Sequence, residues 1–256
     1  MYVTASHSPT SNLPPDTKER QGQQSMSKPY VAAVLGGSGS VGRHIVKKLL
    51  SDPKCQSVLL VSRRPLDDLK QLDPDRIRVE VRDPIDDMGM LPGRIDVAFC
   101  TLGIGAASKA KKDDLLRVDA TIPAAFAVAC RNAGASHYCL MTAVGSDETA
   151  KWSPFTRTGA GGGWYNHVKG KAERLTADVG FPYLMIAQPG VLLGSPHTPT
   201  MLEYVPNAVL PLKYSSAHVA DIAKGMVKAT TNAFQSDEAG PRTVTIAGGI
   251  PISEAE

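Results

Sequence analysis

Short apolar runs alternate with longer amphipathic runs from residue 30 to the end of the chain. The amphipathic run at 40–51 places Val41, Ile45 and Leu49 at helical spacing. The pattern predicts strands at residues 30–35, 57–62, 77–81, 95–103, 137–145, 182–190 and 242–248, and helices at residues 40–51, 113–134, 164–179 and 216–232. Such alternation predicts an α/β fold, with a doubly wound, mostly parallel sheet covered by helices on both faces.

Residues 1–29 lack this pattern. They are rich in Ser, Thr, Pro and Gln and contain no apolar run typical of a signal peptide. We therefore expect a disordered N-terminal segment at 1–29, followed by a single domain at 30–256 with a small C-terminal, substrate-side region. Asp16 and Glu19 argue against a strong mitochondrial presequence, so we expect a cytoplasmic protein, with mitochondrial association left open.

Composition excludes several classes of function. The chain is 42% hydrophobic and 21% charged, with a formal net charge of +3, which gives no basis for binding nucleic acid. No apolar run approaches the roughly 18 residues of a transmembrane helix. The four cysteines have no CxxC spacing, so we expect reduced, buried thiols and neither a disulfide framework nor a metal site; they are Cys55, Cys100, Cys130 and Cys139.

A glycine-rich turn separates the first predicted strand from the first helix. Gly36, Gly39 and Gly42 lie three residues apart there. Glycine permits a sharp turn and a close approach of a ligand to the backbone, and the following helix N-terminus attracts a pyrophosphate. The turn therefore predicts dinucleotide binding. The residues expected to contact the cofactor are Gly36, Ser38, Gly39, Ser40, Val41 and Gly42.

The end of the second strand indicates which dinucleotide binds. NAD sites usually have an acidic residue there, which binds the ribose 2′-hydroxyl. This chain has Ser62, Arg63 and Arg64 instead. Guanidinium groups suit a 2′-phosphate, so we expect NADP(H), unless both arginines are merely solvated. After the third strand, Asp83 either accepts from the adenine amino group or caps a turn before Pro84.

A candidate catalytic pair lies on the predicted helix at 164–179. Tyr165 and Lys169 are four residues apart, so both side chains lie on one face. An ammonium in that place lowers the pKa of a nearby phenol and suits it for proton transfer. The same spacing is also ordinary on a helix surface. The rest of the chain decides between the two interpretations.

The motifs occur in the order found in the atypical short-chain dehydrogenase/reductases. The chain resembles these proteins over about residues 30–231, and within them the branch of the Tat-interacting oxidoreductase. The resemblance is carried by Gly36-x-x-Gly39-x-x-Gly42, Arg63–Arg64, Thr101-Leu102-Gly103, Tyr165-x-x-x-Lys169 and Pro189-Gly190.

The resemblance implies a Rossmann domain that binds NADP(H). In it, Tyr165 handles the substrate proton, and Lys169 binds the nicotinamide ribose and lowers the pKa of the phenol. A Ser-Ser pair of the branch falls on Thr142 and Ala143, so either Thr142 or the nearby Ser146 orients the substrate oxygen. The remaining cofactor contacts implied are Thr101, Leu102, Gly103, Pro189 and Gly190.

These observations favour an NADP(H)-dependent oxidoreductase that transfers a hydride to or from a small carbonyl or alcohol substrate. Two alternatives stay open: a non-enzymatic NADPH-binding regulator, and an epimerase or dehydratase on the same scaffold. The irregular stretch at 201–215 is either a substrate lid or a surface connection, and the glycine-rich stretch at 146–163 is either a flap or a loop insertion. A homodimer or a protein partner is compatible with each of the three candidate functions.

Overall fold

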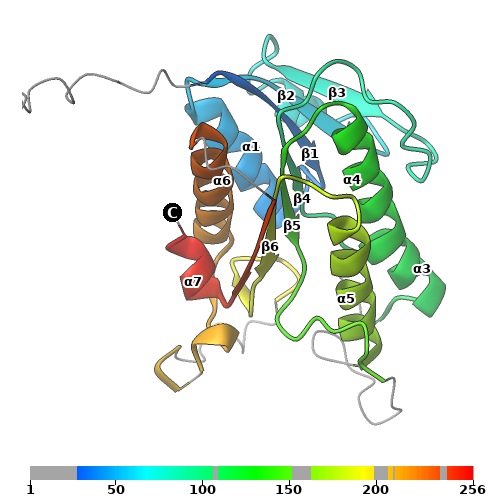
Figure 1. Cartoon of the computed structure of the whole chain (residues 1–256), viewed down its shortest axis with the longest axis vertical. Coiled ribbons are helices and arrows are strands. Elements are labelled where there is room, and N and C mark those ends of the chain that lie inside the picture. The colour runs from blue at the N-terminus through cyan, green and yellow to red at the C-terminus, as the bar shows by residue number, and fades with distance from the viewer. Residues whose placement is uncertain are drawn as a thin grey trace, which may run out of the picture.

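One seven-stranded parallel sheet forms the centre of the molecule (Figure 1). The computed structural model describes residues 28–105, 109–151, 163–198, 207–209, 211–236 and 241–255. The sheet order is β3-β2-β1-β4-β5-β6-β9, so the strand order reverses beside β1, where such folds bind their ligands. The strands are β1 (Tyr30–Leu35), β2 (Cys55–Ser62), β3 (Ile77–Val81), β4 (Val97–Cys100), β5 (His137–Met141), β6 (Tyr183–Gln188) and β9 (Arg242–Ala247). The predicted doubly wound α/β fold is confirmed.

Helices cover both faces of this sheet (Figure 1). On one face lie α1 (Ser40–Ser51), α6 (Val219–Gln235) and α7 (Gly249–Ser253). On the other lie α3 (Lys112–Leu116), α4 (Ile122–Asn132) and α5 (Gly163–Ala177), with a π-helical turn, Arg117–Thr121, joining α3 to α4. The smaller elements are α2 (Asp67–Lys70), 3₁₀ turns at Asn207–Val209 and Leu212–Tyr214, and a two-stranded sheet of β7 (Leu192–Leu193) and β8 (Ala217–His218).

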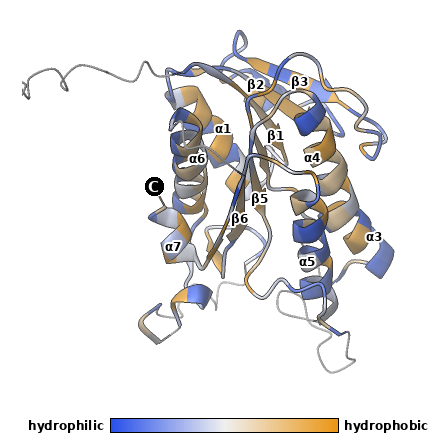
Figure 2. Cartoon of the chain, viewed as in Figure 1, coloured by the Kyte–Doolittle hydropathy of each residue, from blue (hydrophilic) through white to orange (hydrophobic). Residues whose placement is uncertain are grey.

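Two apolar cores hold the layers together, one on each face. Because side chains alternate along a strand, β1 contributes Ala32 and Val34 to the core under α1 and α6, and Ala33 and Leu35 to the core under α4. A strand buried on both faces reads as a continuous apolar run, which is how β1 appears in the sequence. Figure 2 shows hydrophobic residues on the central strands and α4, whereas α5 carries mostly hydrophilic ones.

The predicted boundaries hold best where the residue pattern is regular. Residues 30–35, 40–51 and 77–81 form β1, α1 and β3 as predicted. The predicted fourth and fifth strands end earlier, at Cys100 and Met141, because the chain leaves the sheet there to form loops at its carboxyl edge. The predicted helix at 113–134 is α3, the π-helical turn and α4 in succession.

The cysteines, the helices and the N-terminal segment can be compared with the sequence-based expectations only within the described residues. All four cysteines are buried and free. Across the described ranges, no helix is long and apolar enough to cross a bilayer, and no cluster of three or more His, Cys, Asp or Glu residues is placed to hold a metal. Residues 1–27 of the expected disordered segment lie outside the described residues. Lys28 is already held against α6, where its backbone N–H and C=O both pair with Gln235 at 2.8 Å.

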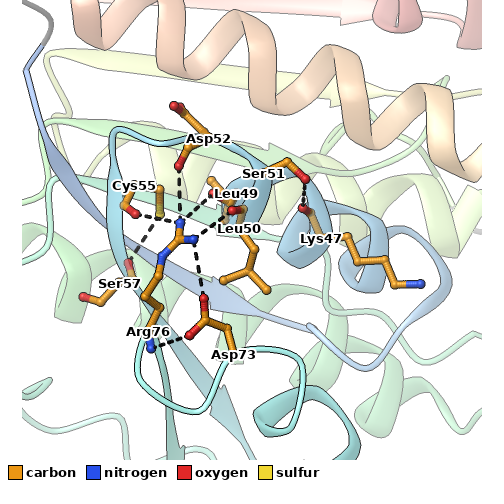
Figure 3. Close-up of polar contacts among 9 residues, drawn as sticks. All are labelled: Lys47, Leu49, Leu50, Ser51, Asp52, Cys55, Ser57, Asp73 and Arg76. Atoms are coloured by element: carbon orange, nitrogen blue, oxygen red, sulfur yellow. Dashed lines mark hydrogen bonds and ion pairs between the residues drawn. The ribbon is translucent and has the colours of Figure 1, made fainter.

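Arg76 secures the C-terminal end of α1 (Figure 3). Its guanidinium donates to the carbonyl oxygens of Leu50 (2.9 Å) and Cys55 (2.8 Å), and it pairs with Asp73 at 3.5 Å. The last carbonyls of a helix have no intrahelical partner, and a cation is favourable there. Arg76 therefore joins the turn before β3 to the turn between α1 and β2.

We expect Arg76→Met to lower the free energy of unfolding by roughly 2–3 kcal/mol, because several charge-assisted hydrogen bonds are lost together. Urea denaturation followed by circular dichroism measures this. Arg78→Met is the matched control: Arg78 lies on exposed β3 surface, so its replacement should cost about 0.5 kcal/mol or less. Equal costs for the two variants would show that the capping role of Arg76 is unimportant.

Candidate cofactor-binding and catalytic site

The glycine-rich turn packs directly against the end of β4. Gly36 has a φ of +86°, and a Cβ added there would lie 2.7 Å from the backbone nitrogen of Leu102. A Cβ on Gly42 would lie 2.1 Å from the carbonyl oxygen of Gly36. The Thr101 hydroxyl donates to that same carbonyl at 3.3 Å. Gly36 and Gly42 are therefore required for the turn itself, and the turn lies beside the predicted Thr101–Leu102 contacts.

The N-terminus of α1 follows this turn and suits an anion. Gly39 is its N-cap, with extended backbone and no side chain to cap the helix. The first turn contains no acidic residue. Its backbone N–H groups and the positive end of the helix dipole therefore favour a phosphate. The Ser40 hydroxyl lies 3.3 Å from the Ser195 hydroxyl, so the chain after β7 lies next to this helix end.

A cavity of about 300 Å³ opens between the ends of β2 and β4 and the π-helical turn. Its size is at the lower end of the range for small-molecule sites, roughly 300–1,000 Å³. Its walls combine apolar side chains, which suit a flat base, with the charged residues Arg63, Arg117 and Asp114. The lining residues are Arg63, Ile85, Leu102, Gly103, Ile104, Asp114, Arg117, Val118 and Ile122.

Two predicted adenosine-side residues lie outside this lining. Arg64 is exposed, and its carbonyl accepts a hydrogen bond from the Ser62 hydroxyl. Asp83 is exposed in the loop after β3, and Ile85 of the same loop faces the cavity instead. Of the predicted adenosine-side contacts, the cavity thus contains Arg63, while the roles of Arg64 and Asp83 stay predictions.

Tyr165 and Lys169 lie in the first half of α5 and face the same region. Lys169 is buried, and its Nζ lies 5.7 Å from the centre of the Tyr165 ring. A Cβ on Gly103 would lie 3.6 Å from that Nζ. Since Gly103 also lines the cavity, the cavity and the catalytic pair are adjacent. The residues predicted for the two halves of a dinucleotide site therefore form one continuous band.

An unpredicted carboxylate, Asp119 on the π-helical turn, completes this group. Its Oδ1 lies 2.7 Å from Lys169 Nζ, and the two side chains are only 2% and 5% exposed. Its Oδ2 accepts a hydrogen bond from the Ile104 backbone N–H at 2.9 Å. Asp119 therefore fixes both the ammonium and the loop after β4. π-helical turns are rare and are frequent at functional sites.

The groups of the chain itself shift the pKa of the Tyr165 phenol upward, opposite to the expected direction. Burial raises the pKa of its phenol; the Lys169 charge lowers that pKa, whereas Asp119 raises it, and the net direction is upward. Burial lowers the pKa of Lys169, but the charges of Asp119 and Tyr165 raise it more, so the ammonium keeps its proton. The expected direction of the Lys169 effect is present, but within the chain itself burial outweighs it.

The two candidate oxygen holders are both engaged in hydrogen bonds. The Thr142 hydroxyl, just after β5, donates to Oε1 of Glu173, which also accepts from Gln188 Nε2 at 2.8 Å. Burial raises the pKa of Glu173, although these two hydrogen bonds oppose the rise. The Ser146 hydroxyl donates to the backbone carbonyl of Ala143 at 2.6 Å. Glu173, like Asp119, is therefore a carboxylate near the site that the sequence-based prediction did not include.

The predicted Pro189–Gly190 pair lies beside the substrate-side segment. The Pro189 carbonyl accepts from Val144 N–H at 3.0 Å, which joins the loops after β5 and β6. A Cβ on Gly190 would lie 2.6 Å from the Ser215 carbonyl oxygen, so Gly190 is packed under the chain at 211–215. Residues 201–206 and 210 of the proposed lid, and 152–162 of the proposed flap, lie outside the described residues.

A model of a protein family described as "NAD(P)H-binding" matches residues 36–233, well over half of the chain. The chain belongs to this NAD(P)H-binding family. Rat (Rattus norvegicus) protein HTATIP2 is 28% identical over 162 residues, 62% of each chain, so the match spans less than two thirds of that relative. "Protein fmp52-1, mitochondrial" of Aspergillus terreus is 25% identical over 86% of this chain and 96% of its own length.

Solved structures share the fold of this NAD(P)H-binding protein. BdcA in complex with NADPH superposes with a TM-score of 0.62 at 18% identity, covering 87% of this chain and 96% of its own. A short-chain dehydrogenase from Streptomyces avermitilis gives 0.56 at 20% identity, covering 86% and 88%. The resemblance to short-chain dehydrogenase/reductases is thus confirmed for the fold.

The residues of this chain fit a dinucleotide. Gly36 and Gly42 leave no room for a Cβ, the N-cap of α1 has no side chain, and the cavity beside Arg63, with apolar and polar walls, suits a base and its ribose. When bound, the nicotinamide of such a cofactor supplies or accepts a hydride. The fit agrees with the match to the NAD(P)H-binding family.

Proposed function

We propose that the protein is an NADP(H)-dependent oxidoreductase of the short-chain type, acting on a small carbonyl or alcohol substrate. The observation that carries the proposal is the continuous band from Arg63 through Gly103 to Lys169 and Tyr165. One end suits a 2′-phosphate, and the other carries the half-buried Tyr165 beside the buried Lys169. A protein that only bound the cofactor would not require an acid/base pair next to the cofactor site.

Tyr165 is the acid/base of this proposal. In the reducing direction its hydroxyl donates a proton to the substrate oxygen while the carbonyl carbon receives the hydride, and the phenolate then regains a proton from water. Lys169 binds the nicotinamide ribose and, as a cation, stabilises the phenolate formed in that step. Both side chains lie on one face of α5, so they act on one spot.

Ser146 is the better candidate to hold the substrate oxygen. Thr142 donates its only proton to the Glu173 carboxyl, which also accepts from Gln188, so turning this hydroxyl away would break a shared network of side-chain hydrogen bonds. Ser146 donates to a neutral backbone carbonyl. Its hydroxyl therefore turns towards a substrate at the smaller cost. Thr142 and Glu173 instead hold the end of β5 against α5 and β6.

We expect tighter binding of NADPH than of NADH, by roughly tenfold or more, because a hydrogen bond to a charged group contributes about 1.5–3 kcal/mol. Arg63→Ala should remove most of this preference, since Arg63 lines the cavity. Arg64→Ala tests the second predicted contact, and Arg131→Ala, on the exposed C-terminal turn of α4, is the control. Titration calorimetry with both cofactors measures it. Equal wild-type affinities for the two cofactors would contradict the proposed specificity.

A cofactor-responsive regulator is the second candidate. It is favoured by the hydrogen bond that occupies the Thr142 hydroxyl, which keeps that hydroxyl from a substrate oxygen. Such a protein would bind NADPH with the same band of residues and would present a different surface with and without it. Binding without consumption of NADPH across a panel of carbonyl compounds would favour this candidate over the first.

The cellular location is a separate proposal. We keep the expectation of a cytoplasmic protein, although the Aspergillus terreus relative is named mitochondrial. Imaging of the full chain with a C-terminal fluorescent tag distinguishes the two compartments. Co-localisation with a mitochondrial marker would contradict the expectation.

A further inference from the structure

Asp119 and Lys169 form a buried ion pair directly beside the proposed acid/base. Both oxygens of Asp119 are used, Oδ1 by Lys169 at 2.7 Å and Oδ2 by the Ile104 N–H at 2.9 Å. Gly103 lies against both partners, since a Cβ there would be 3.2 Å from Asp119 Oδ1. The carboxylate is therefore held from two sides, by Lys169 and by the loop after β4.

This pairing changes the charge that Tyr165 experiences. An ammonium 5.7 Å from the ring favours the phenolate when it is alone. The carboxylate paired with it offsets part of that effect, and burial of the phenol outweighs the rest. Glu173 on α5 and Cys100 on β4 are the other titratable groups acting on Lys169, and Lys112 of α3 lies over the neighbouring Trp164 ring.

We propose that Asp119 is a positioning residue that acts as the counter-ion of Lys169 and so raises the pH at which Tyr165 gives up its proton. A protonated phenol can give a proton to a carbonyl oxygen but cannot take one from an alcohol. The site is thereby set for reduction: the carbonyl carbon gains a hydride from the reduced cofactor and the oxygen gains the Tyr165 proton. The direction of reaction rests on the proposed function, whereas the proton state of Tyr165 does not.

The test is an alkaline titration of Tyr165 in the protein alone, without cofactor or substrate. Phenolate formation is followed by ultraviolet absorbance, and the curve of the matching Tyr165→Phe variant is subtracted in each background. Circular dichroism at each pH verifies that the chain stays folded. Wild-type Tyr165 should titrate above the ordinary tyrosine value of about 10.

The wild type, Asp119→Asn, Lys169→Met and the double variant form a double-mutant cycle. The proposal predicts the order in which Tyr165 ionises in these four proteins. Asp119→Asn keeps an oxygen for the Ile104 N–H and leaves Lys169 unopposed, so Tyr165 should ionise at a pH lower by roughly 1–3. Lys169→Met leaves the carboxylate alone, so Tyr165 should ionise at a higher pH than in the wild type. The double variant should return close to the wild type. Asp113→Asn, which removes an exposed carboxylate of α3, should change nothing.

Two results would overturn the proposal. One is a wild-type Tyr165 that titrates at or below the ordinary value. The other is an Asp119→Asn protein whose Tyr165 ionises no earlier than in the wild type, or, if that variant does not fold, a Lys169→Met protein whose Tyr165 does not ionise later. A failure of carbonyl reduction with an intact titration order would count against the enzyme proposal alone.

Discussion

Replacing Tyr165 with phenylalanine should lower turnover of a carbonyl substrate by about 10²–10⁴-fold, the range lost with a positioned acid/base. The change deletes one oxygen and leaves the ring in its place on α5. NADPH affinity should therefore stay almost unchanged, because Lys169, which is proposed to bind the ribose, keeps its ion pair with Asp119. Steady-state rates and calorimetry on the same preparations separate the two effects.

Tyr138→Phe is the matched control for this prediction. Tyr138 is a buried tyrosine of β5 whose hydroxyl points at the Pro123 carbonyl, 3.5 Å away, on the α4 side of the sheet. It loses the same atom without touching the proposed site. Turnover should be as in the wild type. A Tyr165→Phe protein that reduces its substrate as fast as the Tyr138→Phe protein would leave Tyr165 without a catalytic role.

Replacing Gly42 with alanine should weaken NADPH binding by about tenfold to 100-fold. The new Cβ would lie 2.1 Å from the Gly36 carbonyl oxygen and 2.9 Å from the Gly37 Cα, so the turn itself must move. Forcing one extra carbon into a packed site costs typically 1–3 kcal/mol, and each 1.4 kcal/mol is about tenfold in affinity. The loss should appear both in calorimetry and as a lower free energy of unfolding.

Gly37→Ala is the control within the same turn. Its Cβ would meet only side-chain carbons, the nearest being Leu60 Cδ2 at 3.4 Å, which is ordinary van der Waals contact. Affinity for NADPH should be nearly that of the wild type. If Gly42→Ala binds NADPH as tightly as Gly37→Ala does, the turn is not the pyrophosphate site.

The sequence predicts the fold where a periodic pattern is long enough to be distinctive. Residues 40–51 carry three turns of helix spacing and form α1 at those bounds. α2 has four residues, α7 has five, and β7 and β8 have two each, so each spans little more than one period of its hydrophobic pattern, too short to be distinctive. Their formation depends on tertiary contacts that a local pattern does not contain.

The residues of the candidate site also divide into those that the sequence predicts and those that depend on tertiary contacts. Glycine spacing predicts the cofactor turn, because the backbone geometry leaves no choice of residue at Gly36 and Gly42. Asp119 escapes prediction, since an acidic residue after Arg117 reads as ordinary helix surface until the fold buries it. Glu173 had a signal: it lies four residues after Lys169, which repeats the spacing that indicated Tyr165 and Lys169.

The central claim is that the protein transfers a hydride, and labelled NADPH tests it most directly. The wild-type protein is incubated with NADPH carrying deuterium at the transferable position and with a panel of small aldehydes and ketones, and the products are analysed by mass spectrometry. The account predicts deuterium on the former carbonyl carbon of at least one compound, and its loss with Tyr165→Phe. NADPH that binds in the predicted preference over NADH but passes deuterium to none of the panel would contradict the claim.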